Sequence, residues 1–138
     1  MSERVRKILI VEDNPGDLRL IREALRSKGI RSEIEHYETA DAGVRVVQNY
    51  RADAVNLPEV ILLDFNLPAG TAREVLVAIQ GNPALAKAKK AVLTCSVAPK
   101  DREQAMAAGA DIFVYKPSEL DDFLNDVGSA VQSLLGEN

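Results

Sequence analysis

Four apolar segments of this chain lead into residues that could take part in phosphate chemistry. The segments "KILIV", "VILLD", "VLT" and "IFVY" place, in that order, Glu12 and Asp13, Asp64, Thr94, and Lys116 at or just beyond their ends. A carboxylate can attack a phosphoryl donor and keep the group as an acyl phosphate. Cations and a hydroxyl donor stabilise the oxygens of the transferred group. Together these residue types predict a site that accepts a phosphoryl group on Asp64.

The acidic residues of this set also suit a metal ion. Glu12 and Asp13 are adjacent, and Asp64 would add a third carboxylate at the same edge of a sheet. Carboxylates, water and phosphate oxygens are the usual ligands of Mg²⁺, and a divalent cation would remove the repulsion between the three acids. The alternative is that Glu12 and Asp13 simply begin a helix, whose positive end favours acids.

Simpler interpretations exist for the remaining residues. Lys116 could be an ordinary surface lysine, although its place between an apolar segment and Pro117 holds it at the rim of a sheet. Thr94 could be a strand residue chosen for its β-branched side chain. We expect Cys95 to be a small buried thiol and His36 to be a structural strand residue.

Hydrophobic periodicity predicts the elements that position these residues. Short branched runs predict strands, helical spacing predicts amphipathic helices, and Asn14 and Thr39 are predicted N-caps. The strands are expected at 7–11, 31–37, 59–65, 90–96 and 111–115, and the helices at 15–28, 39–50, 71–82, 98–109 and 118–135. This alternation predicts an α/β fold, a doubly wound parallel sheet with helices on both faces.

Length and composition limit the class of protein. At 138 residues, we expect one domain covering 1–138, with no output domain and no linker. One cysteine excludes an internal disulfide and favours a reducing compartment. We find no signal-peptide pattern and no apolar run of the length a membrane span needs, so we expect a cytoplasmic protein. A net charge of −4 argues against a nucleic-acid partner.

Four motifs, "ILIVEDN", "VILLDFNLP", "VLTCS" and "AGADIFVYKP", occur in this order along the chain. In these motifs the sequence resembles the receiver domain of two-component response regulators over essentially its whole length. The resemblance implies a flavodoxin-like sheet of five strands in the order 2-1-3-4-5. It also implies phosphotransfer from a sensor histidine kinase to the receiver, which acts as a signalling switch and not as an enzyme on other substrates.

The resemblance assigns roles to single residues. It implies that Asp64 is the phosphoacceptor, that Glu12 and Asp13 hold Mg²⁺, and that Asn66 offers its backbone carbonyl to the same ion. Lys116 would pair with the phosphoryl group.

Two further residues resemble the family's switch positions. Thr94 matches the hydroxyl that turns toward the phosphoryl group, and Phe113 matches the aromatic residue whose packing changes. The resemblance also favours a cis peptide between Lys116 and Pro117.

The motifs look most like the stand-alone regulators that partner bacterial phytochrome kinases. Two segments depart from that group: "AGTAREV" after Pro68 and the lysines of "AKAKKAVL". The signal would leave through a target protein, a further phosphotransfer step or a homodimer. We expect such a dimer to use the face formed by the fourth helix, the fifth strand and the last helix.

Three other functions fit the residues less well. An aspartate-nucleophile phosphatase would need a second acid two residues after Asp64, where Asn66 stands. A flavin-binding module would need a phosphate loop after the first strand, where Glu12 and Asp13 oppose an anion. A receiver that only mediates contacts would have no need of these acids and of Lys116.

Overall fold

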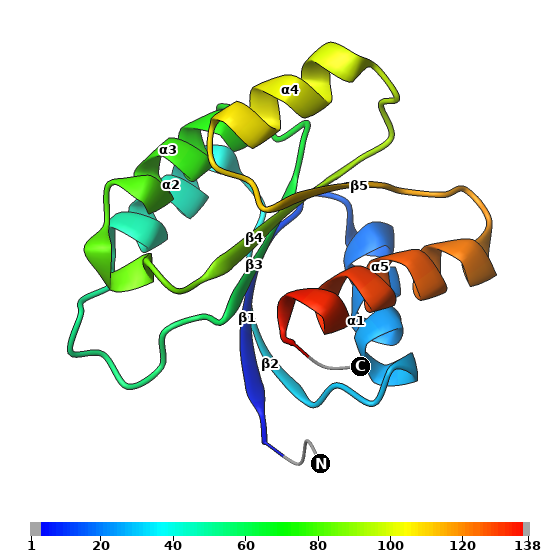
Figure 1. Ribbon diagram of the computed structural model, residues 1–138, viewed down its shortest axis with the longest axis horizontal. Coiled ribbons are helices and arrows are strands. Elements are labelled where there is room, and N and C mark those ends of the chain that lie inside the picture. The colour runs from blue at the N-terminus through cyan, green and yellow to red at the C-terminus, as the bar shows by residue number, and fades with distance from the viewer. Residues whose placement is uncertain (1–3, 137–138) are drawn as a thin grey trace.

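The computed structural model describes residues 4–136 and has a parallel sheet between two layers of helices (Figure 1). The strands follow the order β2-β1-β3-β4-β5, as the resemblance implied. Their bounds are β1 Arg6–Val11, β2 Ser32–Tyr37, β3 Val60–Asp64, β4 Lys89–Thr94 and β5 Ile112–Tyr115. The helices are α1 Pro15–Ser27, α2 Ala40–Asn49, α3 Ala72–Gln80, α4 Pro99–Ala107 and α5 Leu120–Leu134, with a short 3-10 turn at Pro83–Leu85.

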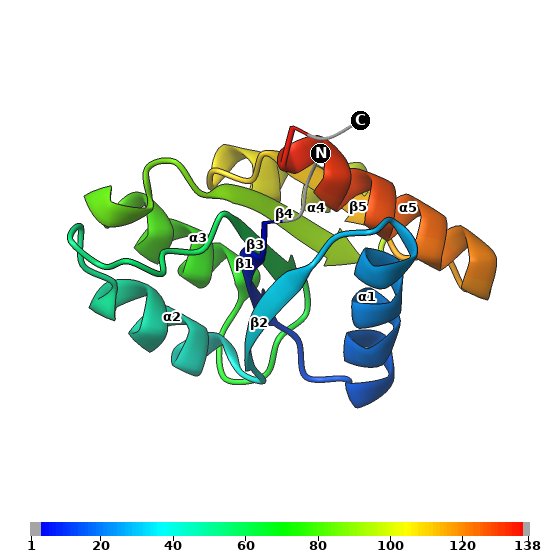
Figure 2. The same ribbon diagram turned by 90° about the horizontal axis from the view of Figure 1, so that it is seen from below.

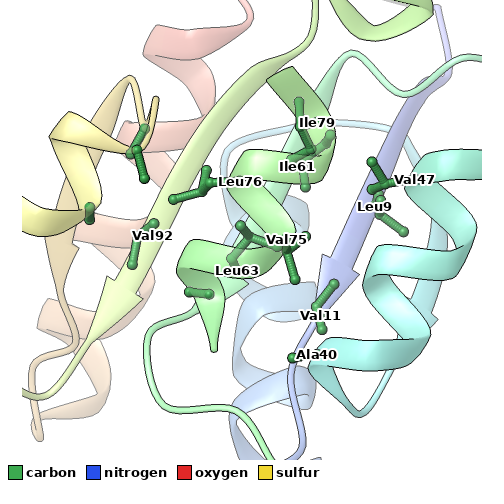
Figure 3. Packing of buried hydrophobic residues seen from close by; sticks show 14 of the residues in the cluster. Leu9, Val11, Ala40, Val47, Ile61, Leu63, Val75, Leu76, Ile79 and Val92 are labelled. Carbon is green, nitrogen blue, oxygen red and sulfur yellow. The ribbon is translucent and has the colours of Figure 1, made fainter. Parts of the chain in front are cut away.

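The helices divide between the two faces of the sheet. Helices α1 and α5 cover one face, and α2, α3 and α4 cover the other (Figures 1 and 2). The side chains of β1 alternate accordingly, because successive residues of a strand point to opposite faces. Ile8 and Ile10 pack with the α1 and α5 layer, whereas Leu9 and Val11 pack with α2 and α3 (Figure 3). Burial on both faces explains why the central strands are apolar throughout.

Side-chain caps mark the start of α1, α2 and α3. Asn14 caps α1 by accepting a hydrogen bond from the backbone N–H of Asp17 at 3.1 Å, and Thr39 caps α2 in the same way. Both caps confirm the prediction from sequence. Thr71 and Glu74 form a reciprocal capping box at the start of α3.

The parallel strands bring their carboxyl ends to one edge of the sheet. Val11 lies beside Leu63, Asp64 beside Leu93, and Thr94 beside Tyr115. The loops after β1, β3, β4 and β5 therefore meet at this edge, which is where open α/β sheets bind their ligands.

Two expectations about single residues are wrong. Cys95 is exposed, because β4 ends at Thr94 and the chain turns outward there. The Lys116–Pro117 peptide is trans; a trans peptide is the more stable isomer before proline by about 0.5–1 kcal/mol. No helix within residues 4–136 is both long and apolar enough to cross a membrane.

Candidate metal and phosphoryl site

The ammonium group of Lys116 lies at the centre of the carboxyl edge. Its Nζ donates to Glu12 Oε1 at 2.9 Å, to Asp64 Oδ1 at 2.8 Å and to Asp17 Oδ2 at 2.8 Å. An ammonium has three N–H groups, so each one has a carboxylate partner. Only 5% of the Lys116 side chain is exposed, which excludes the interpretation of an ordinary surface lysine.

The backbone around Glu12 and Lys116 is fixed by further hydrogen bonds. The backbone N–H of Lys116 donates to the carbonyl of Thr94 at 2.7 Å, which extends the pairing of β5 with β4 to the lysine itself. Glu12 is buried, and its Oε2 accepts from the backbone N–H of Asn14 at 3.1 Å. His36 Nε2 donates to the backbone carbonyl of Glu12 at 2.7 Å, so this histidine is structural, as expected, and also supports the site.

Three acids at this edge match the donor set of a hard divalent cation. Carboxylate oxygens of Glu12, Asp13 and Asp64 all lie within 4.8 Å of one another. Asp13 is exposed and Asp64 is partly buried, so the group opens toward solvent. Mg²⁺ commonly binds one or two carboxylates and keeps several waters. An acidic group that is open to solvent can supply the carboxylates and leave room for the waters.

The balance of charge at the site shifts the pKa values of its residues. Burial raises the pKa of Asp64 above its ordinary value, and the hydrogen bond from Lys116 only partly opposes that effect. Burial raises the pKa of Glu12 for the same reason, again against the hydrogen bond from Lys116. Burial alone would lower the pKa of Lys116, but its hydrogen bonds with Asp17, Asp64 and Glu12 outweigh burial and raise it. The site therefore holds a permanent ammonium and more carboxylates than that ammonium can stabilise.

Thr94 lies at the same edge but makes its hydrogen bond within its own loop. The side chain is buried, and Oγ1 accepts from the backbone N–H of Ser96 at 2.9 Å. Ser96 Oγ in turn donates to Asp101 Oδ2 in the first turn of α4 at 2.6 Å. The hydroxyl of Thr94 is thus linked to the start of α4 through one serine.

Phe113 connects the last strand to the residue that follows Asp64. Its ring meets the ring of Phe65 edge to face, with centroids 5.9 Å apart and planes at 88°. Phe113 is partly buried and packs against the core layer of α2, α3 and α4. Asn66 is exposed in the loop after β3, two residues beyond Asp64.

One residue of the site was missed from the sequence. Asp17 was included in the first helix without a role, yet its carboxylate is one of the three that hold Lys116. The available signal was its position: an acid in the first turn of a helix that follows the Glu12–Asp13 pair returns to the same edge of the sheet. The direction in which that helix leaves the strand could not be read from the sequence.

Comparison with known sequences places the chain in a family. Residues 8–128 match the model of the response regulator receiver domain. The response regulator Rcp1 of Synechocystis sp. is 32% identical over 121 residues, which are 87% of this chain and 82% of that protein. The transcriptional regulatory protein KdpE of Mycobacterium tuberculosis is 33% identical over 125 residues, or 91% of this chain. The chain spans about half the length, 50%, of that KdpE regulator.

Solved structures agree with this placement. The phosphorylated cyanobacterial phytochrome response regulator RcpA superposes with a TM-score of 0.83 at 29% identity, covering 96% of this chain and 95% of that one. The Mn²⁺-bound form of response regulator Rcp1 superposes with a TM-score of 0.78 at 30% identity, covering 92% of each chain. A response regulator from Hahella chejuensis gives 0.82 at 30% identity, with 94% and 95% covered. This chain belongs to the receiver-domain family of two-component response regulators.

Proposed function

We propose that this receiver takes a phosphoryl group from the phosphohistidine of a sensor kinase onto Asp64, and that the transfer depends on Mg²⁺. The observation that carries this proposal is the contact of Asp64 Oδ1 with the buried Lys116 ammonium at 2.8 Å, beside two further acids. A nucleophilic carboxylate, a fixed cation and a free acidic group are the parts that phosphoryl transfer needs.

The chemistry requires one bond to form and one to break. A carboxylate oxygen of Asp64 forms a bond to phosphorus, the P–N bond of the phosphohistidine breaks, and its electron pair stays on the imidazole nitrogen. Lys116 would hold an oxygen of the arriving group, and Thr94 would donate its hydroxyl hydrogen to another. Glu12, Asp13 and Asp64, with the backbone carbonyl of Asn66, would hold Mg²⁺. The bound ion supplies positive charge to the phosphoryl oxygens.

The switch proposed here runs from Thr94 to the face formed by α4, β5 and α5. Movement of the Thr94 hydroxyl toward a phosphoryl group would change its bond to Ser96 N–H, and Ser96 is tied to Asp101 of α4. Phe113 would repack between Phe65 and the same helix.

The α4, β5 and α5 face is a candidate surface for passing the signal on. Tyr115 at the end of β5 and Leu120 at the start of α5 are exposed, with 48% and 54% of their surface accessible, as is Val97 in the loop before α4, with 81%. We propose that this face binds a target protein, a further phosphotransfer partner or a second copy of the chain. The likeness to RcpA supports a kinase of the phytochrome type as the donor.

Intact-protein mass spectrometry after incubation with acetyl phosphate tests the proposal. We expect the wild type to gain one phosphoryl group in the presence of Mg²⁺, and hydroxylamine to remove it because the product is an acyl phosphate. Asp64→Asn should gain none. Asp41→Asn is a matched control, because it removes the same charge from the first turn of α2, away from Lys116.

Two results would contradict the proposal. One is a wild type that gains nothing while a control regulator is phosphorylated in the same tube, which would favour a receiver that only mediates contacts. The other is equal phosphorylation of Asp64→Asn, which would move the acceptor to another residue.

A further inference from the structure

The third carboxylate on Lys116 has no part in the function proposed above. Asp17 Oδ2 takes one of the three N–H groups of the lysine at 2.8 Å, as close as Asp64 Oδ1 does. We propose that Asp17 is a positioning residue that holds the Lys116 ammonium toward α1 and thereby slows phosphoryl transfer to Asp64. This inference rests on the proposed function of Asp64.

Asp17 is held in place by the start of its helix. It is the third residue of α1, after Pro15 and Gly16, and its backbone N–H donates to the N-cap side chain of Asn14 at 3.1 Å. Its side chain is 27% exposed, so it is neither free in solvent nor enclosed with the core. The carboxylate therefore meets Lys116 from a fixed backbone position.

The lysine has no spare hydrogen-bond donor in this arrangement. Its three N–H groups are shared among Glu12, Asp17 and Asp64. A phosphoryl oxygen that arrives on Asp64 must therefore displace a carboxylate or share a donor with it. Glu12 keeps a second partner in the Asn14 N–H, whereas the Asp17 carboxylate would be left to solvent. Asp17 is thus a direct competitor of the phosphoryl group for this cation.

Asp17 also adds a negative charge where an anion must enter. Glu12, Asp13 and Asp64 already place three carboxylates within 4.8 Å of one another. Small phosphoryl donors carry negative charge at neutral pH, so Asp17, as a fourth carboxylate at this edge of the sheet, raises the electrostatic cost of their approach. Both effects act in the same direction, toward slower transfer.

The simpler interpretation is that Asp17 only stabilises α1. Acids in the first turn of a helix interact favourably with its positive end. On that interpretation, Asp17→Asn would lower the free energy of unfolding slightly and leave the phosphorylation kinetics unchanged. The two interpretations therefore predict different results in a kinetic experiment.

The test measures phosphorylation rates over a range of acetyl phosphate concentrations at saturating Mg²⁺. We expect Asp17→Asn to lower the half-saturating concentration roughly three- to tenfold, the effect of one nearby unit charge in a partly solvated site, with a smaller change in the maximal rate. Asp17→Glu keeps the charge and should stay within twofold of the wild type. Asp41→Asn, which removes an acid from the first turn of another helix, should also keep the half-saturating concentration within twofold of the wild type.

The second measurement does not depend on phosphorylation. Ammonium protons held in three hydrogen bonds exchange slowly with water, so the Lys116 Nζ should give a ¹H–¹⁵N signal, assigned by its loss in Lys116→Arg. Asp17→Asn should broaden or abolish that signal, and Asp41→Asn should preserve it.

The outcomes separate the two proposals. An unchanged Lys116 signal and unchanged kinetics in Asp17→Asn would overturn the role of Asp17 while leaving Asp64 as phosphoacceptor. Equal acceleration by Asp41→Asn would also overturn it, because the effect would then be one of net charge. Failure of the wild type to accept phosphate would overturn the proposed function, and the NMR signal would still decide whether Asp17 holds the lysine.

Discussion

Two charged clusters on the same sheet are built in opposite ways. On β2, the carboxylate of Glu35 is the centre: Tyr37 and Tyr50 donate their hydroxyls to it at 2.5 and 2.6 Å, and Lys7 Nζ lies 3.3 Å away. At the carboxyl edge, the ammonium of Lys116 is the centre, and carboxylates surround it. The Glu35 cluster has an excess of hydrogen-bond donors, and the Lys116 cluster, the acceptor-rich cluster, has an excess of acceptors.

The pKa shifts of the two clusters follow from this difference. Burial would raise the pKa of Glu35, but the hydrogen bonds from Tyr37, Tyr50 and Lys7 outweigh burial and lower it. For Asp64, burial outweighs the help of Lys116, and the pKa is raised. A carboxylate with enough donors stabilises the fold when ionised, whereas the ionisation of a buried carboxylate that lacks them costs stability.

The largest expected effect is the loss of the central cation. Lys116→Ala leaves the carboxylates of Glu12, Asp17 and Asp64 without their shared donor, and removing one partner of a buried ion pair costs about 3 kcal/mol. Lys7→Ala is the matched change at the other cluster and should cost less than about 1 kcal/mol, because Glu35 keeps two hydroxyl donors. Urea denaturation at pH 7 without Mg²⁺ measures both. Equal losses of unfolding free energy in Lys116→Ala and Lys7→Ala would show that both clusters depend on their lysine to the same degree.

Addition of Mg²⁺ should stabilise only the acceptor-rich cluster. At a concentration about a hundredfold above its dissociation constant, a ligand that binds only the folded state adds about 2.7 kcal/mol. We expect thermal unfolding to shift upward in the wild type and in Glu35→Gln. The shift should be largely lost in Asp13→Asn, and a full shift in that variant would exclude Asp13 as a ligand.

Glu35→Gln should destabilise the protein by about 1–2 kcal/mol at pH 7, since two phenol hydroxyls lose an ionised acceptor. The pKa of Glu35 in the folded state lies below its ordinary value of 4.5, so its contribution is complete above that pH and is lost as the pH falls through the folded pKa. The difference in the free energy of unfolding between wild type and variant should therefore shrink as the pH falls below 4.5. A constant difference would contradict the lowered pKa.

The smallest expected effect has the opposite sign. Asp64→Asn removes one charge from the acceptor-rich cluster and keeps an oxygen for Lys116, so it should stabilise the protein by up to about 1 kcal/mol at pH 7 without Mg²⁺. Because the pKa of Asp64 is raised in the folded state, the unfavourable contribution of its ionisation appears as the pH rises through that pKa and is absent in acid. Destabilisation at pH 7 would show that the Lys116 contact outweighs the repulsion.

The same comparison explains what could be predicted from the sequence. Asp64, Glu12, Asp13 and Lys116 could be placed together because each ends or follows a strand, and parallel strands share one carboxyl edge. The Glu35 cluster was missed because its second phenol, on Tyr50, follows the end of α2, and no local sequence pattern brings Tyr50 to Glu35 on β2.

The prediction for Cys95 failed and the contact of Asp17 was missed for a similar reason, because both depend on contacts between distant parts of the chain. Cys95 was expected inside because strand 90–96 was drawn two residues too long, and strand ends are set by pairing that hydrophobicity alone does not reveal. Asp17 could be placed in a helix. Its contact with Lys116 could not be predicted, because the two residues lie 99 positions apart in the sequence.

The three bonds of Lys116 also bear on when the protein becomes competent during synthesis. They join residues 52, 99 and 104 positions apart, and such distant contacts form late because long loops must close first. A chain that has emerged only as far as β4 carries its acids without their lysine. We expect the proposed phosphorylation of Asp64 to become possible only when β5 has paired with β4 and has brought Lys116 to the acids.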